Sequence, residues 1–256
     1  MRVAVVLFPG MNCENESVRA LESVGLAAEI VRANEPDRLD AFDGFLLPGG
    51  FSYEDRIRAG VVAAHLPVME RIVRAAEAGR PVAGICNGAQ VLLETGLVPG
   101  LHPGRVEMAL ALNDSGQRVG YYCDWRWLVG DLFPEPMPLP FAHAEGRFVT
   151  RDPAVEAAIG DRGLIAARYC EPNGKVTRAW PVNPNGAFDN AAAIRNPEGN
   201  VLAIMPHPER ANWAFQVPVS VEGEWREAKR SGFRDAPGPG RPFFTAFADL
   251  MRRAAA

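Results

Sequence analysis

The fold is decided by residues 81–94, Pro81-Val-Ala-Gly-Ile-Cys86-Asn-Gly-Ala-Gln90-Val-Leu-Leu-Glu94. An apolar run with the length of a buried strand ends at Ile85, and a segment with helical periodicity begins near Val91. The cysteine lies between them, where a strand must turn sharply into a helix. Gly84-Ile-Cys86-Asn-Gly88 therefore has the form of a nucleophile elbow with cysteine in place of serine.

Cys86 has the setting of a catalytic nucleophile in this elbow. Gly84 and Gly88 leave room for close approach of strand and helix, while the turn forces Cys86 into a strained backbone conformation. The helix N-terminus favours the thiolate, which is the form that attacks carbonyl carbon. A lone cysteine is more often a small buried side chain, but the strand-turn-helix context favours catalysis.

Around the elbow, apolar runs alternate with helical periodicity over the first hundred residues. Continuous apolar runs are typical of parallel strands buried on both faces, and their alternation with helices indicates βαβ units. We predict an α/β fold with a doubly wound open sheet, whose functional residues lie at the carboxyl ends of the strands. The expected strands are 2–8, 28–32, 44–48 and 81–86, and the expected helices are 16–24 and 61–78.

From about Arg105 the pattern changes to strands without intervening helices. Turn signals such as Asn113-Asp-Ser-Gly116 and Asn196-Pro-Glu-Gly199 separate several of them, as expected for antiparallel hairpins. We predict that these strands extend the parallel sheet into a mixed one. The expected strands are 106–112, 118–123, 147–149, 164–169, 191–194 and 201–205.

The 256 residues are predicted to form one domain, 1–256, because an α/β fold of this length commonly has a single core. The run Pro237-Gly-Pro-Gly240 and scattered prolines and glycines make 211–242 a surface excursion. A terminal amphipathic helix is expected over 243–253.

His207 is the best candidate for the base that a thiol nucleophile needs. It lies in Met205-Pro-His-Pro-Glu-Arg210, directly after an apolar strand. Flanking prolines hold this segment extended, which puts residues 207 and 209 on the same side. Glu209 can then orient the imidazole and stabilise its cation, as the acid of a triad does. An isolated His beside a Glu would more often be a surface pair.

Gly49 and Gly50 end another predicted strand in Leu47-Pro-Gly-Gly-Phe51. Backbone N–H groups without side chains around them suit a developing oxyanion. A lone Pro-Gly-Gly is usually only a tight turn, so this segment supports the triad without deciding it.

Composition excludes several classes of protein. A net charge of -4 offers no basic field for nucleic acid. The apolar N-terminal run breaks at Pro9-Gly10, which favours a strand over a signal peptide. No stretch of the sequence approaches the roughly 20 apolar residues that span a bilayer. The four cysteines are far apart and form no CxxC pair, so we expect reduced thiols in a cytoplasmic protein, with neither a metal site nor disulfides.

The assembled motifs resemble class I (triad-type) glutamine amidotransferases. The superfamily is marked by the GxCxGxQ pattern of 84–90 and by the His-Pro-Glu of 207–209. Other segments resemble the glutaminase subunit of phosphoribosylformylglycinamidine synthase, an enzyme of purine biosynthesis. These segments are Phe8-Pro-Gly-Met-Asn-Cys13, Pro48-Gly-Gly-Phe-Ser-Tyr53, Arg58-Ala-Gly60, His143-Ala-Glu-Gly-Arg147, Asn183-Pro-Asn-Gly186 and 205–210.

The resemblance implies a flavodoxin-like sheet with an antiparallel extension, and it implies roles. Cys86 would form a γ-glutamyl thioester and release ammonia, with His207 as base and then acid. The N–H groups of Gly50 and Asn87 would form the oxyanion hole, and Gln90 would contact glutamine. ATP and Mg²⁺ would be used by a separate synthetase subunit, usually joined by a third small subunit, and this chain has no phosphate motif of its own.

Some positions depart from the family pattern. Glu54, Ala89 and Met11 stand where Gly, Phe and Ser are common, and none of them removes a catalytic atom. His143 is expected either to line the glutamine pocket or to brace a hairpin, with nothing in the sequence to decide. We take His65 and His102 to be surface residues.

Other functions compete with this interpretation. The glutaminase could serve guanylate, anthranilate or carbamoyl phosphate synthesis, although the 48–53 and 183–186 segments argue against it. A flavodoxin-like cysteine hydrolase usually has its His close after the Cys, whereas residue 87 is Asn. An inert regulator would need a broken triad, and all three members are present.

Overall fold

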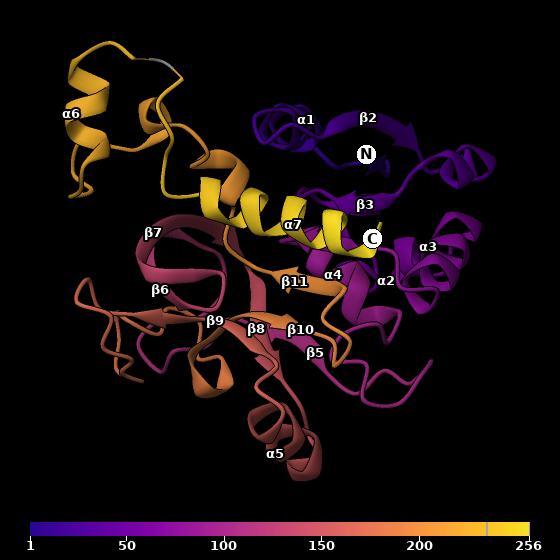
Figure 1. Cartoon of the computed structure of the whole chain (residues 1–256). Coiled ribbons are helices and arrows are strands. Elements are labelled where there is room, and N and C mark those ends of the chain that lie inside the picture. The colour runs from indigo at the N-terminus through magenta and orange to yellow at the C-terminus, as the bar shows by residue number, and fades with distance from the viewer. Residues whose placement is uncertain (234, 256) are drawn as a thin grey trace.

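The computed structural model describes residues 1–233 and 235–255. Within this part of the chain, nine strands form one mixed sheet that runs through the molecule (Figure 1). Its first five strands are parallel, in the spatial order β2 (Ala27–Arg32), β1 (Arg2–Leu7), β3 (Gly44–Leu47), β4 (Val82–Ile85) and β11 (Val201–Ile204). This is the order of a flavodoxin-like sheet, so the predicted α/β class is confirmed.

Helices cover both faces of the parallel strands. Helix α1 (Glu14–Glu22) packs on β1 and β2 and against α7 (Arg241–Ala254). Helix α4 (Asn87–Glu94) packs on β3, β4 and β11 and against α2 (Val61–Ala64), while α3 (Pro67–Glu77) completes the crossover from β3 to β4. The crossover from β1 to β2 runs in one direction along the sheet, and the crossover from β3 to β4 runs in the opposite direction. Because parallel crossovers are right-handed, their helices lie on opposite faces of the sheet.

The centre of the sheet explains its continuous apolar sequences. Every residue of β3, β4 and β11 is buried, since helices cover these strands on both sides. The carboxyl ends of these three strands lie side by side, because β4 pairs in parallel with both β3 and β11. Segments distant in the sequence therefore meet at one edge.

Four antiparallel strands extend the sheet beyond β11, as predicted. They are, in order, β10 (Ala191–Arg195), β9 (Ile165–Cys170), β6 (Tyr122–Gly130) and β7 (Phe133–His143). The remaining strands depart from the prediction of a single sheet. In the described chain, β5 (Ala109–Leu112) and β8 (Glu145–Val149) pair only with each other.

Strand β7 was not predicted, because prolines stand at four alternate positions in it: Pro134, Pro136, Pro138 and Pro140. The strand is the last of its sheet and pairs with β6 alone. Every second amide of an edge strand points away from the partner, so proline at those positions removes no ladder hydrogen bond. The spacing of these prolines at every second position was the sequence signal of an edge strand.

Helix boundaries also differ from the prediction. Helix α5 (Pro153–Asp161) interrupts the region expected to lack helices, and its N-cap Asp152 accepts a hydrogen bond from the Ala154 N–H at 2.9 Å. The helix expected over 61–78 is split into α2 and α3, because Pro67 starts a new helix and the residue before it is extended. The strand expected at 118–123 begins only at Tyr122.

The segment 211–242 has structure of its own. It contains helix α6 (Trp225–Arg230), which Figure 1 shows beside β6 and β7. Ala214, Val217 and Trp225 are buried in a small apolar cluster against Trp125 and Trp127 of β6. The excursion is therefore anchored to the antiparallel half of the sheet.

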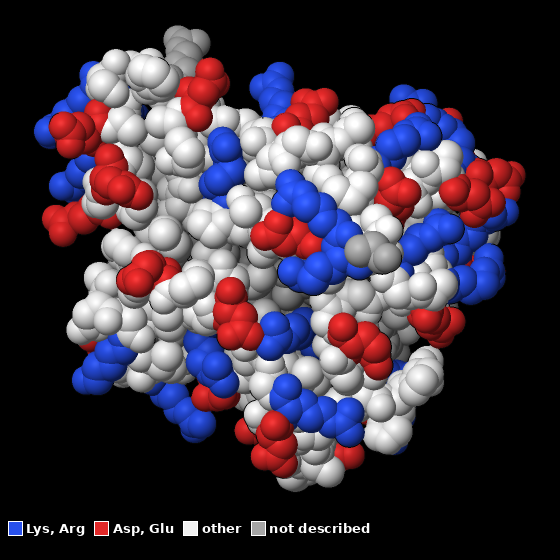
Figure 2. Space-filling model, viewed as in Figure 1, with Lys and Arg blue, Asp and Glu red and all other residues white. Residues whose placement is uncertain are grey.

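The distribution of charge and the lengths of the helices bear on nucleic acid and membranes as partners. Figure 2 shows Lys and Arg side chains interspersed with Asp and Glu over the face in view. No helix of residues 1–233 and 235–255 is long and apolar enough to cross a membrane.

Candidate functional site

Cys86 occupies a strained turn between β4 and α4. Its backbone has φ 51° and ψ −106°, and its N–H donates to the Ile204 carbonyl at 2.8 Å. A Cβ at Gly84 would meet the Gly88 carbonyl oxygen at 2.5 Å, and one at Gly88 would meet the Leu47 oxygen at 2.0 Å. The glycines thus permit the close strand and helix approach predicted for an elbow.

His207 follows β11, the strand beside β4, and so comes to the same edge of the sheet as Cys86. Its N–H donates to the Pro140 carbonyl of β7 at 2.8 Å. Its Nδ1 lies 2.5 Å from Oε1 of Glu209, with His207 4% exposed and Glu209 fully buried. The Pro-His-Pro-Glu segment therefore places the imidazole and carboxylate together, as its spacing predicts.

The electrostatics of His207 favour its charged form. Burial alone would lower the pKa of the imidazole. The negative charges of Glu209 and Cys86, with hydrogen bonding to the sulfurs of Cys13 and Cys86, outweigh burial and raise the pKa well above its ordinary value. An imidazole that holds a proton beside a thiol can shuttle that proton to a leaving nitrogen.

The Gly49–Gly50 turn is fixed by backbone contacts with the segment before α1. Gly50 has φ +147° and bridges to Met11, and the N–H groups of Asn12 and Cys13 both donate to the Gly49 carbonyl at 3.3 Å. Within the described chain, the N–H groups of Gly50 and Asn87 have no hydrogen-bond acceptor. Two such donors near a nucleophile can receive a developing oxyanion.

A side-chain network supports the elbow. The Asn87 Oδ1 accepts from the Ser52 N–H at 3.0 Å, and its Nδ2 donates to Oε1 of Gln90 at 2.8 Å. The Gln90 Nε2 donates to the Glu145 carbonyl at 2.7 Å. The oxygen and the nitrogen of the Gln90 amide therefore both form hydrogen bonds within the protein. The contact of Gln90 with glutamine stays a prediction.

Comparison with known proteins decides the family. A family model described as the CobB/CobQ-like glutamine amidotransferase domain matches residues 1–236. The chain belongs to the glutamine amidotransferase family. Among its curated relatives, the phosphoribosylformylglycinamidine synthase subunit PurQ of Methanothrix thermoacetophila is 42% identical over 99% of this chain and 97% of that protein.

Two further relatives agree. The subunit PurQ of Thermus thermophilus is 44% identical over 82% of this chain and 90% of its own length. The structure of PurLQS from Thermotoga maritima contains a chain with a TM-score of 0.69 at 30% identity, covering 98% of both chains. These similarities favour the glutaminase subunit of phosphoribosylformylglycinamidine synthase. They argue against the other amidotransferases and the cysteine hydrolase.

In this amidotransferase, the contacts of His143 support the role of a hairpin brace. Its ring is buried against Gly146, where a Cβ would lie 2.0 Å from Cε1, and Nδ1 lies 3.1 Å from Nδ2 of Asn113. Asn113 Nδ2 also donates to the His143 carbonyl at 2.7 Å. Burial, with a contribution from His207, lowers the His143 pKa to about 3, so the ring is neutral.

The other two histidines lie away from the triad. His65 is exposed, and its Nδ1 lies 3.0 Å from the Val61 carbonyl. His102 pairs with Glu107 and has a largely exposed side chain. Both are surface residues, as predicted.

The structure adds residues to the amidotransferase site that sequence reasoning missed. The Ala142 carbonyl of β7 lies 3.9 Å from Sγ of Cys86, so this edge strand forms a wall beside the nucleophile. Cys13 is buried, and its Sγ accepts from the Arg210 guanidinium at 3.1 Å. The signal for Cys13 was its place in the Phe8–Cys13 motif, which ends at the carboxyl edge of β1.

Asp55 lies near the elbow and is a further titrating group. Burial and then the Glu145 carboxylate raise its pKa to about 6, and the Asn87 amide opposes this shift by donating to it at 3.2 Å. Asp55 belongs to a loop in which Tyr53, Glu54 and Ile57 also have positive φ. The strained part of the loop begins at Tyr53, shortly after the Gly49–Gly50 turn.

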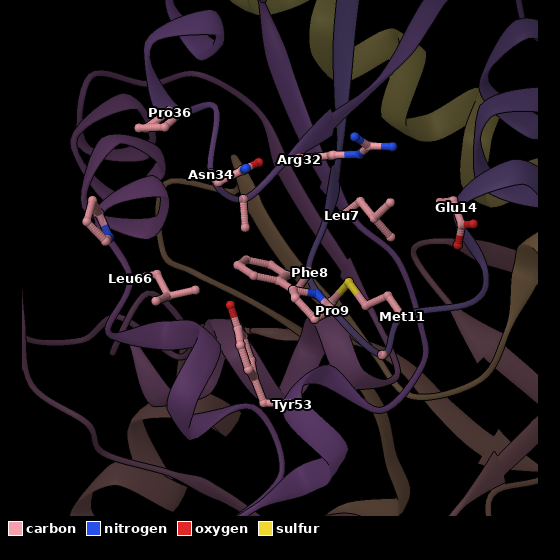
Figure 3. Close-up of a pocket in the computed structure, with 13 residues that line it drawn as sticks. Leu7, Phe8, Pro9, Met11, Glu14, Arg32, Asn34, Pro36, Tyr53 and Leu66 are labelled. Atoms are coloured by element: carbon pink, nitrogen blue, oxygen red, sulfur yellow. The ribbon is translucent and has the colours of Figure 1, made fainter.

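A cavity of about 730 Å³ adjoins this loop (Figure 3). Phe8, Tyr53 and Leu66 lie together in it, with Glu14 at the far end. Its wall includes Met11, which pairs with Gly50. The cavity is therefore lined by the segment that pairs with the Gly49–Gly50 turn.

Proposed function

We infer that this chain is the glutaminase subunit of phosphoribosylformylglycinamidine synthase. It hydrolyses glutamine to glutamate and ammonia for a synthetase that converts formylglycinamide ribonucleotide to formylglycinamidine ribonucleotide in purine biosynthesis. The observation that carries this conclusion is the Cys86 elbow beside the His207–Glu209 pair, in a chain 42% identical to a PurQ subunit over nearly its full length.

In the first step, Cys86 Sγ attacks the side-chain amide carbon of glutamine as a thiolate, its proton being held already by His207. The carbonyl oxygen becomes an oxyanion that the N–H groups of Gly50 and Asn87 stabilise. When the C–N bond breaks, His207 donates its proton to the departing nitrogen, which leaves as ammonia. The product on the protein is a γ-glutamyl thioester.

In the second step, water attacks the thioester carbon and gives a proton to His207. The C–S bond then breaks, the Cys86 sulfur leaves as the thiolate beside protonated His207, and glutamate leaves. Glu209 accepts the Nδ1–H of His207 throughout, so it fixes the ring and stabilises the imidazolium. Glutamine is thus hydrolysed by side chains of this chain alone.

The ammonia acceptor belongs to a partner. The Thermotoga maritima relative is a chain of a structure named PurLQS, and this name lists two further components, L and S, beside Q. We expect an ATP- and Mg²⁺-dependent synthetase subunit and a small third subunit to assemble with this chain, in the cytoplasm. Glutamine is its small-molecule substrate, and no nucleic acid or membrane enters the proposal.

The test is reconstitution with the synthetase subunit. With [amide-¹⁵N]glutamine, ATP and formylglycinamide ribonucleotide, the label is expected in the amidine product only when this chain is present. Label transfer with xanthylate or chorismate and their synthetases, but not with formylglycinamide ribonucleotide, would overturn the assignment of pathway while preserving that of glutaminase.

A further inference from the structure

Cys13 stands beside the triad and makes or breaks no bond in the proposed reaction. Ligand atoms of Cys13, His207 and Glu209 all lie within 4.8 Å of one another, and all three residues are buried. The Cys13 residue precedes α1, and its backbone N–H is bound to the Gly49 carbonyl, so the thiol is held in place at the carboxyl edge of the sheet. A thiol, an imidazole and a carboxylate thus converge from distant parts of the chain.

We propose that Cys13, His207 and Glu209 form an inhibitory binding site for a soft divalent cation of the Zn²⁺ type. Thiolate, imidazole and carboxylate are the ligands that Zn²⁺ takes, at about 2.0 to 2.3 Å from the metal. Ligand atoms of such a site lie about 3.3 to 3.8 Å apart, so small side-chain movements would close this cluster around an ion. Three protein ligands leave a fourth position for water.

The second carboxylate oxygen of Glu209 is an independent indication. Oε1 accepts from His207, but Oε2 is buried and has no hydrogen-bond partner among the described residues. A buried carboxylate oxygen without a partner is costly. A cation bound between Oε2, Nδ1 of His207 and Sγ of Cys13 would satisfy it.

Binding requires protons to leave. Burial raises the pKa of the Cys13 thiol, so the free group holds its proton, and a coordinating cation would displace that proton outright. A second proton leaves Nδ1 of His207, because the metal takes the lone pair. The Arg210 guanidinium, 3.1 Å from the sulfur, opposes the added cation but also stabilises the thiolate. The formal charge on the cluster of three ligands and Zn²⁺ is zero.

The occupied site would stop the glutaminase. A metal on Nδ1 takes Glu209 away from its orienting bond. With its lone pair on the metal, the neutral imidazole carries its one proton on Nε2, so His207 could no longer receive the proton of Cys86 or of the attacking water. Inhibition in this sense depends on the proposed function, whereas metal binding does not.

The binding test uses Co²⁺ as a spectroscopic substitute for Zn²⁺ on the full chain. Cys86→Ala removes the other nearby thiol, so a near-ultraviolet thiolate-to-Co²⁺ absorption that remains must come from elsewhere. We expect the band in Cys86→Ala, its loss in Cys86→Ala/Cys13→Ala, and its retention in Cys86→Ala/Cys170→Ala, in which another buried thiol is removed. A band that disappears with Cys86 alone, or survives loss of Cys13, overturns the site.

The inhibition test uses Zn²⁺ alone on the chain assembled with its synthetase. In Cys13→Ala the half-inhibiting Zn²⁺ concentration, measured against that variant's own metal-free rate, is expected to rise by at least about tenfold, because loss of even an outer partner of a metal ligand commonly costs that much. Cys170→Ala should match the wild type. Should Cys13→Ala fold poorly, Cys13→Ser supplies the smaller change. Equal inhibition of wild type and the folded Cys13 variant overturns the proposal.

Discussion

Gly49 lies directly against the imidazole of His207: a Cβ at position 49 would meet Cε1 at 2.6 Å and Nδ1 at 3.3 Å. The turn that we propose as the source of oxyanion donors and the proposed base are therefore one packed unit. An added methyl group has to displace the ring, because the Gly49 carbonyl is fixed by Asn12 and Cys13.

We predict that Gly49→Ala lowers kcat/KM for glutamine hydrolysis by about 10²-fold, the effect of misplacing a catalytic group by roughly 1 Å. Steady-state glutaminase assays of the assembled complex measure it. Gly160→Ala in α5 is the matched control, since no described atom lies within 4 Å of a Cβ there. Equal activities of the two variants would show that the contact does not position His207.

Cys86→Ala separates ammonia release from ammonia use. We predict that glutamine-dependent amidine synthesis falls by at least about 10⁴-fold, as expected when a triad nucleophile is removed. Synthesis from added ammonium chloride should be unchanged, because the thiol serves only to liberate nitrogen. Cys123→Ala is the control, as this thiol is exposed on β6. Substantial glutamine-dependent turnover in Cys86→Ala would remove Cys86 from the triad.

The parallel half of the sheet and the meeting of Cys86, His207 and Glu209 were predictable because their signals are local. The elbow around Cys86 and the extended His207–Glu209 segment each follow a buried strand, and neighbouring parallel strands bring their carboxyl ends together. The Phe8–Cys13 motif predicts that Cys13 lies at the carboxyl edge of the sheet, but its contact with His207 was not predictable, because it also depends on the path of the Gly49–Gly50 turn to which Cys13 is bound.

The antiparallel half was predicted less well for a related reason. The pairing of β5 with β8 outside the main sheet is a choice of partners between strands far apart in the chain, which hairpin signals do not specify. The β7 prolines oppose a central strand and permit an edge strand, so their meaning depends on the place of β7 in the sheet.

The isolated chain is predicted to hydrolyse glutamine slowly and to be activated by its synthetase. The loop after Gly50 contains strained residues, and its Ile57 is 94% exposed, so a partner can change the loop and the turn together. A few kcal/mol of differential binding is enough for such a population shift. Glutamate release is measured with and without the synthetase; a fully active isolated chain, unchanged on addition, contradicts this prediction.

The buried neutral His143 should make stability fall in acid. Its pKa is lowered from 6.5 to about 3 on folding, so between these values the unfolded chain binds more protons and stability is lost as pH falls below 6.5. From pH 7.5 to pH 5 the group should cost roughly 2 kcal/mol of unfolding free energy. Urea unfolding of wild type and His143→Gln at both pH values tests it. The loss of unfolding free energy from pH 7.5 to pH 5 should be smaller in His143→Gln by roughly the same 2 kcal/mol, whatever the variant's stability at pH 7.5. An unchanged difference would contradict a neutral His143.

The last prediction concerns Glu209, which should matter less than Cys86 or His207. The nucleophile and the base make bonds, whereas the carboxylate orients and stabilises; in a serine triad the acid costs about 3 × 10⁴ in rate, against about 2 × 10⁶ for either partner. Glu209→Gln keeps an acceptor for His207 but loses the charge. We expect it to lose at least about tenfold in kcat and to retain more activity than His207→Ala.

The pH profile of Glu209→Gln distinguishes orientation from simple damage. Although burial opposes it, the Glu209 charge is the foremost cause raising the His207 pKa, so its removal should lower that pKa. Because His207 must donate a proton to the leaving ammonia, activity is lost as pH rises through this pKa, and the alkaline limb of kcat should move to lower pH. Glutaminase rates at saturating glutamine, with the synthetase bound, measure both effects. A variant with wild-type kcat and an unmoved limb would make Glu209 a bystander, and a lower kcat with an unmoved limb would restrict it to packing.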